Sequence, residues 1–300
     1  MDPVVRRRRL LRLLTLVFAV GTGLALGLAI DIVRSGGPGA WLARHGLPAP
    51  YTAKGVRIDI GPRSLYLDCR GTGQPTVVLE AGMGSDSSTW SAVHDELATT
   101  TRTCAYDRAG RGRSDPIERH TLGDAAAELA ALLATAGEPG PYVLVGHSLG
   151  GAYVRVFAGA NRSEVAGLVL VDAFNPDLQD DRIHPLLGPL QPEYEAHLDG
   201  LRDLVSQVES LDWSASEEQV RSSSVVALSI EVLVAPRYEP RLDEAQNAEI
   251  AAAWQAAYES LSPGQVRQTT AWGAGHNVQI DRPDLVIEAT RRLIDLVRDR

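Results

Sequence analysis

One serine of the chain has neighbours that suit a nucleophile. In the sequence YVLVGHSLGG, residues 142–151, Ser148 lies between two glycines, after an apolar run typical of a buried strand and before a helical pattern. A tight turn from strand to helix leaves no room for side chains at positions 146 and 150, and it strains the backbone of the serine. The following helix directs its positive N-terminus toward the turn, where it stabilises developing negative charge. The spacing therefore predicts that Ser148 is a catalytic nucleophile.

The elements that must position this serine alternate between strands and helices. Short apolar, mostly β-branched runs predict strands at Val56–Ile60, Leu65–Cys69, Thr76–Glu80, Thr103–Tyr106, Tyr142–Val145, Val165–Val171 and Ile230–Ala235. We expect a last strand at Gln265–Trp272. Helical patterns lie between them at Trp90–Thr99, Leu122–Ala136, Leu149–Ala160, Glu244–Leu261 and Pro283–Val297. Runs without polar alternation suit parallel strands that are buried on both faces. We therefore expect an α/β fold, with a mostly parallel sheet of about eight strands flanked by helices.

With this order of elements and the motif GHSLGG, the chain resembles the α/β-hydrolase fold family from about residue 56 to residue 297. The stretch YDRAGRGRS, residues 106–114, is similar to the family's D-x-x-G-x-G-x-S loop. There we expect Asp107 and Arg108 to make structural contacts rather than to take part in catalysis. The resemblance implies a serine hydrolase, because the dehalogenases and epoxide hydrolases of the family use aspartate as their nucleophile.

The resemblance also implies an oxyanion hole, the pair of donors that binds the negative charge of a tetrahedral intermediate. In LEAGMG, residues 79–84, Met83 matches the family's oxyanion-hole position, and Leu149 directly follows the nucleophile. Their backbone N–H groups would each stabilise the transition state by roughly 3 kcal/mol. Ala81 stands where the family commonly has histidine, so this loop departs from the usual pattern.

A general base must accept the serine proton and pass it to the leaving group, which suits a histidine with a near-neutral pKa. Of the seven histidines, His276 in GAGHN follows the last predicted strand, as the Ser, acid, His order of this fold requires. We expect His147 to point away from the turn. The others fall in the linker, helices or lid: His45, His94, His120, His184 and His197.

Three carboxylates are candidates for the acid that orients this histidine, which belongs at the carboxyl end of the sixth or seventh strand. Asp172 ends the run LVLVD, a position from which some family members draw their acid. Glu239 in PRYEP stands where most members have Gly-x-x-Asp, and Asp243 follows slightly later. We rank Asp172 first, Glu239 second and Asp243 third.

The segment from residue 174 to about residue 224 interrupts the alternation. It contains several prolines, many acidic residues and one modest helical pattern from Tyr194 to Leu211. An insertion of this size over the carboxyl edge of the sheet predicts a lid. The predicted hydrolase domain covers residues 55–300 with this lid included, and a linker rich in Gly, Pro and Ala precedes it at residues 35–54.

Residues 1–34 are typical of a membrane-directing segment. Arg6–Arg9 and Arg12 precede the charge-free residues 13–30, which as a helix would cover about 27 Å and just cross a thin hydrocarbon core. The arginines favour a cytoplasmic N-terminus, so we expect one N-terminal transmembrane helix with the catalytic domain outside the cell. The alternative is a signal peptide cleaved near residues 25–27, which would give a secreted enzyme.

The two cysteines leave two alternatives open. Cys69 and Cys104 both lie in apolar runs, the usual setting of buried free thiols. In a translocated protein, such a pair can instead form a disulfide.

The sequence as a whole predicts a serine hydrolase that acts on a small carboxylic ester through an acyl-enzyme on Ser148. The choice of ester rests on its frequency within the family, so an amidase, lipase, thioesterase, peptidase or acyltransferase stays an alternative, as does a non-catalytic envelope binding protein. We expect no metal and no organic cofactor, because no cluster of metal ligands and no phosphate-binding glycine loop is present. The formal net charge of −9 argues against a nucleic-acid partner.

Overall fold

The computed structural model describes residues 54–176, 186–187, 190–236 and 240–299. The expected membrane segment at residues 1–34, nearly all of the linker and Glu239 lie outside these residues. Within the described ranges, every helix is too short or too polar to cross a lipid bilayer.

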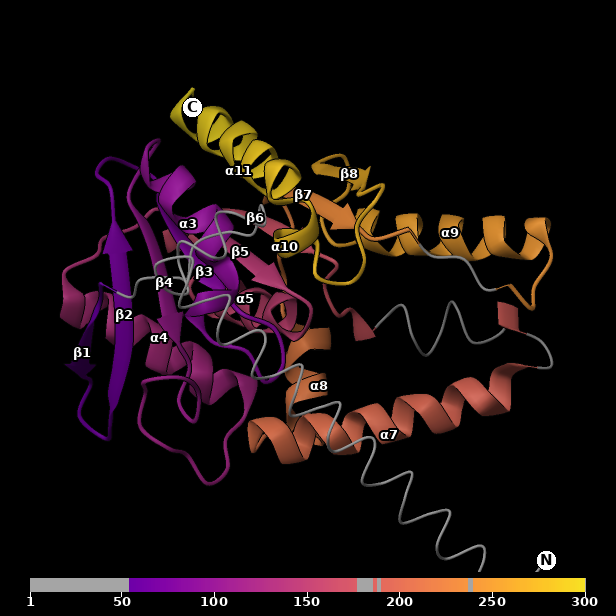
Figure 1. Cartoon of the computed structure of the whole chain (residues 1–300), viewed down its shortest axis with the longest axis horizontal. Coiled ribbons are helices and arrows are strands. Elements are labelled where there is room, and N and C mark those ends of the chain that lie inside the picture. Colours follow the sequence, from indigo (N-terminus) through magenta and orange to yellow (C-terminus); the bar gives the residue numbers. More distant parts are fainter. Residues whose placement is uncertain (1–53, 177–185, 188–189, 237–239, 300) are drawn as a thin grey trace, which may run out of the picture. The chain divides into compact units, whose positions relative to one another are not determined.

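Eight strands form a single sheet (Figure 1). The strands are β1 Val56–Asp59, β2 Ser64–Arg70, β3 Thr76–Glu80, β4 Thr103–Asp107, β5 Tyr142–His147, β6 Val165–Val171, β7 Ser229–Val234 and β8 Val266–Thr270. Their order in the sheet is β1-β2-β4-β3-β5-β6-β7-β8. The β1–β2 and β2–β4 pairs are antiparallel and all others are parallel, so the predicted mostly parallel sheet is confirmed.

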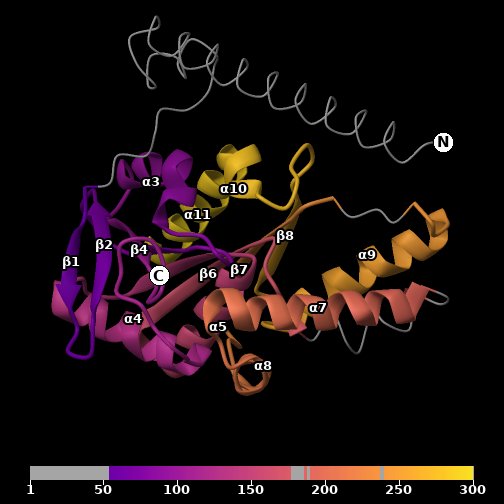
Figure 2. The same cartoon turned by 60° about the horizontal axis from the view of Figure 1, so that its bottom comes forward.

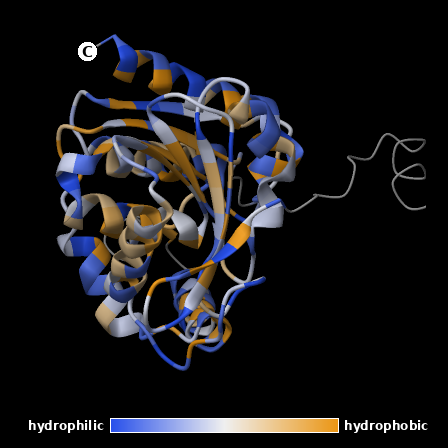
Figure 3. Cartoon of the chain, turned by 90° about the vertical axis from the view of Figure 1, so that its left-hand side faces the viewer, coloured by the Kyte–Doolittle hydropathy of each residue, from blue (hydrophilic) through white to orange (hydrophobic). Residues whose placement is uncertain are grey.

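Helices cover both faces of the sheet (Figure 2). Their bounds are α3 Ser91–Ala98, α4 Leu122–Ala136, α5 Leu149–Ala160, α7 Gln191–Glu209, α8 Trp213–Ser222, α9 Glu244–Glu259, α10 Val278–Asp281 and α11 Pro283–Arg298, with 3-10 turns at Ser87–Trp90 and Arg162–Glu164. Along β5, Leu144 packs into the core with α4 and α5, whereas Val143 and Val145 pack into the core with α3 and α11. Figure 3 shows these hydrophobic strands in the interior, with hydrophilic residues on the outer faces of the helices.

Local sequence explains the ends of α4. The Thr121 side chain accepts a hydrogen bond from the Asp124 N–H, and the Asp124 side chain accepts one from the Thr121 N–H, which forms a capping box. The helix ends at Gly137, whose φ of 70° lies in the left-handed region that glycine adopts without strain. Buried leucines spaced along the helix, among them Leu122, Leu129 and Leu133, face the sheet.

The sheet brings three loops together at its carboxyl edge. From β3 the chain moves to β4 on one side and then returns to β5 on the other side of β3, and such a reversal opens a crevice where ligands bind. Glu80 at the end of β3 is in register with Gly146 of β5. His147 at the end of β5 is in register with Val171 of β6. The loops after β3, β5 and β6 therefore begin at the same level.

In its described residues, the segment between β6 and β7 contains the helices α7 and α8. The expected helical pattern at residues 194–211 corresponds to α7, in which Leu198 and Val205 are buried. We did not predict α8, because its sequence is largely polar and only Ser216 and Val220 are buried along it. Residues 177–185 and 188–189 of the expected lid lie outside the described part of the chain.

The structure decides between the two alternatives for the cysteines. Cys69 on β2 lies directly opposite Cys104 on the antiparallel strand β4, and a disulfide joins them. The disulfide therefore links the antiparallel edge of the sheet to its parallel part.

Candidate active site

The turn between β5 and α5 has the strained geometry that its sequence predicts. Ser148 has φ 51° and ψ −122°, and its N–H donates to the backbone oxygen of Val171 at 3.0 Å. A Cβ added at Gly146 would lie 2.5 Å from the backbone oxygen of Gly150, and one added at Gly150 would lie 2.5 Å from that of Glu80. Neither position has room for a side chain, so both glycines are needed to expose the serine.

Three side chains from three separate loops form a hydrogen-bonded relay. His276, between β8 and α10, has its Nε2 2.9 Å from Ser148 Oγ. Its Nδ1 lies 2.7 Å from Asp172 Oδ2, directly after β6. With the Nδ1 proton donated to the carboxylate, Nε2 is free to accept the proton of the serine hydroxyl. The structure thus brings together Ser148, His276 and the carboxylate that we ranked first.

Backbone contacts hold Asp172 in its place. Its φ of 41° lies in the left-handed region, and its N–H donates to Leu233 of β7 at 2.7 Å. Its Oδ1 accepts from the Ala235 N–H at 3.0 Å, which turns Oδ2 toward the histidine. The Asp172 side chain is 3% exposed, whereas that of His276 is 56% exposed. Asp172 is therefore fixed and buried, while His276 is open to solvent.

The other two candidate acids differ from Asp172. Glu239 lies outside the described residues. Asp243 is exposed and is the N-cap of α9, where its side chain accepts from the Gln246 N–H at 2.8 Å. The Gln246 side chain accepts in return from the Asp243 N–H at 3.1 Å, which completes a capping box. The spacing Asp243-x-x-Gln246 before a helical pattern is the sequence signal of this role.

The prediction that His147 points away from the turn is wrong. Its Nε2 donates to the backbone oxygen of His276 at 2.9 Å, and the centroids of the two rings are 4.8 Å apart. Burial lowers the pKa of His147 to about 4, so the ring is neutral at neutral pH. A Cβ at Gly82 would lie 2.7 Å from His147 Nδ1, which explains the glycine there. His147 therefore supports the loop that carries the candidate base.

A small apolar cavity of about 50 Å³ adjoins the serine. Met83 and Leu149, whose N–H groups we expect in the oxyanion hole, both line it. The N–H of Leu149 lies in the first turn of α5, where helical N–H groups have no partner within the helix. The remaining wall comes from the segment between β6 and β7, with Phe174, Leu198, Leu201, Arg202, Val205 and Trp213.

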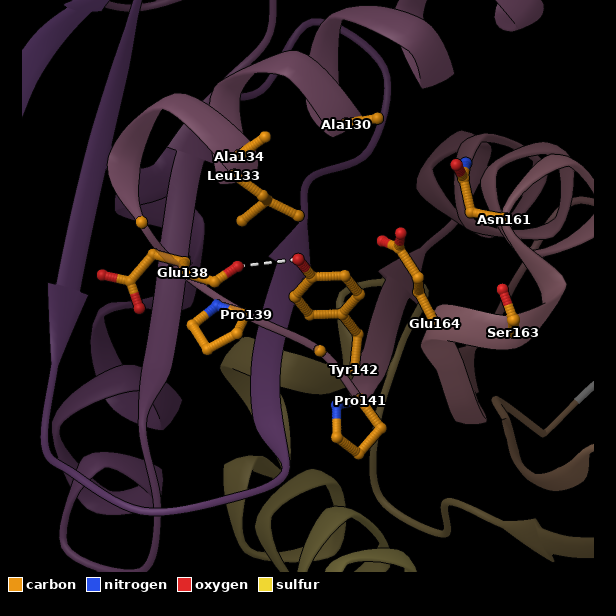
Figure 4. Close-up of a pocket in the computed structure, with 12 residues that line it drawn as sticks. Ala130, Leu133, Ala134, Glu138, Pro139, Pro141, Tyr142, Asn161, Ser163 and Glu164 are labelled. Carbon is orange, nitrogen blue, oxygen red and sulfur yellow. Dashed lines mark hydrogen bonds between the residues drawn. The ribbon is translucent and has the colours of Figure 1, made fainter.

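A larger hollow of about 950 Å³ lies at the opposite end of β5 (Figure 4). It surrounds Tyr142, whose hydroxyl donates to the backbone oxygen of Glu138 at 2.7 Å. Its described lining, from α4, the loop before β5 and the turn after α5, contains no histidine and no cysteine. Its two carboxylates, Glu138 and Glu164, have no histidine beside them, so the described lining offers no serine, histidine and acid relay of the kind found at Ser148.

The loop after β4 makes the structural contacts that its sequence predicts. Asp107 Oδ1 accepts from the Ser87 N–H and Oδ2 from the Arg113 N–H, both at 2.8 Å. Arg108 is buried and forms ion pairs with Glu80 and Glu209. The partnership with Glu209, which comes from α7, is a contact that we did not predict.

One group of side chains in the described part of the chain is close enough to hold a metal ion. It consists of Cys69, Cys104 and Glu138. The two sulfur atoms are already joined in the disulfide, so this group has no thiolate ligand to offer.

Comparisons with known proteins agree with this architecture. A family model described as "Alpha/beta hydrolase family" matches residues 77–289. The uncharacterized protein YqjL of Bacillus subtilis is 28% identical over 220 residues, which cover 72% of this chain and 82% of that protein. An AB hydrolase superfamily protein of Gibberella zeae is 29% identical over 178 residues, or 56% of this chain and 53% of that protein, so the match spans about half of its length.

A thermophilic esterase from Thermogutta terrifontis, solved with malate bound, has a similar fold. The superposition has a TM-score of 0.54 and 24% sequence identity, and it covers 82% of this chain and 99% of the esterase.

Proposed function

Because the chain belongs to the alpha/beta hydrolase family, we propose that it is a serine hydrolase that cleaves carboxylic esters through an acyl-enzyme on Ser148. The observation that carries the proposal is the relay, with 2.9 Å from Ser148 Oγ to His276 Nε2 and 2.7 Å from His276 Nδ1 to Asp172. Nucleophile, base and orienting acid within hydrogen-bond distance are the arrangement that activates a serine hydroxyl.

In the proposed mechanism, His276 Nε2 removes the Ser148 proton as Oγ attacks the ester carbonyl. The N–H groups of Met83 and Leu149 bind the resulting oxyanion, and Asp172 stabilises the imidazolium. The imidazolium then gives its proton to the departing alcohol and leaves an acyl group on Ser148. Water, activated by the same histidine, releases the acid and restores the enzyme.

The walls of the cavity favour a short, apolar acyl group. The cavity is small, and its lining is mostly aliphatic and aromatic. Burying methylene groups there stabilises the bound substrate by about 0.8 kcal/mol each until the cavity is full. A longer chain must displace Leu198 or Val205, both buried on α7. We therefore expect a small-molecule ester with a short acyl chain as the substrate.

A panel of p-nitrophenyl esters from acetate to decanoate, run beside the matching p-nitroanilides, tests this proposal. We expect kcat/KM to be highest for the short esters and the anilides to react far more slowly. The Ser148→Ala variant is the control for hydrolysis by contaminants. Faster cleavage of the anilides than of the esters would indicate an amidase and contradict the proposed esterase activity.

We also propose that residues 13–30 anchor the enzyme in the cell membrane with the catalytic domain outside, or, if cleaved, direct it to secretion. The disulfide between Cys69 and Cys104 supports export, because disulfides persist mainly in oxidising compartments. External protease should remove a C-terminal tag from intact cells in the anchored case. A tag that stays protected, or a protein that fractionates with cytosol, would contradict export.

A further inference from the structure

Three charged side chains, here called the buried ion cluster, lie together beneath the loop that follows β3. They are Glu80 at the end of β3, Arg108 after β4 and Glu209 in the last turn of α7, and each is at most 4% exposed. Arg108 pairs with Glu80 through Nη1 and with Glu209 through Nη2 at 3.1 Å, and its guanidinium lies over the ring of Tyr153 at 4.5 Å. Buried charges are costly to desolvate, so ion pairs and hydrogen bonds must compensate for this cost.

The same charges bind the backbone of the loop. Arg108 Nη1 donates to the backbone oxygen of Ala81 at 2.6 Å, and Nη2 donates to that of Gly82 at 2.9 Å. One residue beyond Met83, the Gly84 N–H donates to Glu209 Oε1 at 2.6 Å. The peptide groups on both sides of Met83 are therefore held by the buried ion cluster.

This arrangement determines the direction of the Met83 N–H. A planar trans peptide directs its C=O and N–H groups to opposite sides, and the cis bonds of the described chain lie elsewhere. The Gly82 oxygen faces Arg108, so the Met83 N–H of the same peptide group faces away from the buried ion cluster. Met83 lines the cavity beside Ser148.

We propose that Arg108 and Glu209 are positioning residues, which orient the Met83 N–H in the oxyanion hole. The inference rests on the proposed function, because the oxyanion role of Met83 belongs to it. Neither residue touches the substrate in this account. Both act through the backbone of residues 81–84.

The contacts of Glu209 with Arg108 and Gly84 make the proposed oxyanion hole depend on the segment between β6 and β7. Glu209 belongs to α7, whose side chains also form a wall of the cavity. Arg111 donates to the backbone oxygen of Val208, and its Nε lies 3.7 Å from Glu209 Oε2, so cations surround the C-terminal end of the helix. A Cβ at Gly84 would lie 3.3 Å from Val208 Cγ1, which shows how closely the loop packs against this end. The proposed oxyanion hole is therefore complete only while the C-terminal end of α7 packs against the loop after β3.

Replacing Arg108 by lysine tests the inference most sharply. Arg108→Lys keeps the positive charge, but one ammonium group cannot bind two carbonyls and two carboxylates in the planar geometry of a guanidinium. We expect kcat to fall about 10- to 100-fold with KM within about threefold, since removing an oxyanion donor outright costs about 100- to 1,000-fold. The affinity of an alkyl boronic acid, a tetrahedral transition-state analogue, should fall by the same factor as kcat/KM.

Arg155→Lys is the matched control. Arg155 is equally buried and joins α5 to α8 through the Val220 backbone oxygen, but it is not bonded to residues 81–84. Its replacement should lower the thermal midpoint by a similar amount while kcat stays within about twofold. An equal loss of kcat in both variants, a loss expressed in KM, or full activity of Arg108→Lys would overturn the inference.

A second variant covers the case in which Arg108→Lys does not fold. Glu209→Gln keeps an oxygen that can accept from Gly84 but removes a charge, and we expect a smaller fall in kcat, about three- to tenfold. Unchanged kcat and unchanged affinity for the boronic acid in this variant would overturn the inference.

Amide hydrogen exchange separates this inference from the proposed function. In Glu209→Ala the Gly84 amide should exchange faster while the core strands keep their protection. Unchanged exchange at Gly84 would overturn the positioning role. A wild-type protein that hydrolyses no ester would instead overturn the proposed function, and it would leave this exchange result to decide whether the loop is held as described.

Discussion

The relay and the buried ion cluster are two charge networks at the same edge of the sheet, and their surroundings differ sharply. The His276 side chain is 56% exposed and borders a cavity, whereas the side chains of Glu80, Arg108 and Glu209 are at most 3% exposed. A group that takes up and releases protons during turnover needs access to the substrate. A group that fixes a backbone needs a charge that stays constant, which a buried arginine provides.

The two carboxylates of the buried ion cluster have pKa values that are shifted in opposite directions. Burial raises the pKa of Glu80 above its ordinary value despite the opposing effect of Arg108. Burial acts on Glu209 in the same direction, but Arg108, the Gly84 N–H and Arg111 outweigh it and lower its pKa. Glu209, the carboxylate that binds the loop, is therefore the one whose charge is best protected. In the proposed mechanism the relay moves protons, whereas the buried ion cluster holds the backbone through Arg108 and through Glu209, whose neighbours favour its charged form.

The largest expected effect comes from breaking the relay at its acid. Asp172→Asn removes the charge that stabilises the imidazolium and favours the wrong tautomer of His276, so we expect kcat to fall about 10⁴-fold. The fold should survive, because the asparagine oxygen can still accept from the Ala235 N–H. Steady-state kinetics with p-nitrophenyl acetate, together with circular dichroism, measures both.

Asp243→Asn is the matched control, since this carboxylate caps α9 in the structure. Asparagine is also a good N-cap, so activity and stability should both change little. A large loss of kcat in Asp243→Asn, or a small one in Asp172→Asn, would show that the acid has been assigned to the wrong residue.

A smaller effect is expected from enlarging the cavity that adjoins Ser148. Leu198→Ala removes a buried side chain from α7 that lines the cavity. We expect the ratio of kcat/KM for octanoate over acetate esters to rise about tenfold, since a few methylene groups at about 0.8 kcal/mol each gain a buried site. Leu187→Ala, a buried leucine outside the lining of this cavity, is the control and should leave the ratio unchanged. A parallel change in both variants would mean that the cavity does not hold the acyl chain.

The smallest expected effect on turnover comes from replacing His147. This residue belongs to neither the relay nor the buried ion cluster, and its ring is neutral at neutral pH. The folded protein protonates His147 only near pH 4, whereas the unfolded chain does so near pH 6.5. Between these values the unfolded state binds more protons, so the free energy of unfolding rises with pH and is lost as pH falls from 6.5 toward 4, by about 3 kcal/mol in full.

His147→Gln keeps a donor for the His276 oxygen but does not titrate, so kcat at neutral pH should change only a few-fold. Urea denaturation at pH 7.5 and pH 4.5 measures the loss of stability between these conditions. The loss should be smaller in the variant than in the wild type. It should not vanish, because burial also lowers the pKa values of His94 and His120, which both proteins retain. An equal loss in both proteins would contradict the burial of a neutral His147.

The local parts of the site could be predicted from sequence, and the non-local ones could not. The strained turn at Ser148 could be predicted from adjacent residues, because two glycines and the change from strand to helix fix its geometry. Most strands followed from continuous apolar runs, with the polar β8 as an exception, and their ends lie within a few residues of the prediction. The choice between Asp172 and Asp243 depended on which loop meets His276, a contact between segments about 100 residues apart, although the capping-box spacing at Asp243 did point to a helix start.

The contacts of Glu209 and His147 illustrate why the rest could not be predicted. Glu209 lies in a polar helix whose composition suggests a solvated surface, and only the packing of α7 onto the loop after β3 buries it. His147 points toward the His276 loop because β5 and β8 end at the same edge of the sheet, which the sequence near residue 147 does not record. Side chains with such long-range partners take their roles from the tertiary fold.

The central claim is that Ser148 is a nucleophile activated by His276, and covalent labelling tests it most directly. The native protein is treated with a fluorophosphonate probe, and the modified peptide is located by mass spectrometry. We predict stoichiometric labelling of Ser148, no labelling of Ser148→Ala and at least 100-fold slower labelling of His276→Gln, in keeping with the contribution of a general base. A correctly folded wild-type protein that stays unlabelled, or that is labelled at another residue, would contradict the claim.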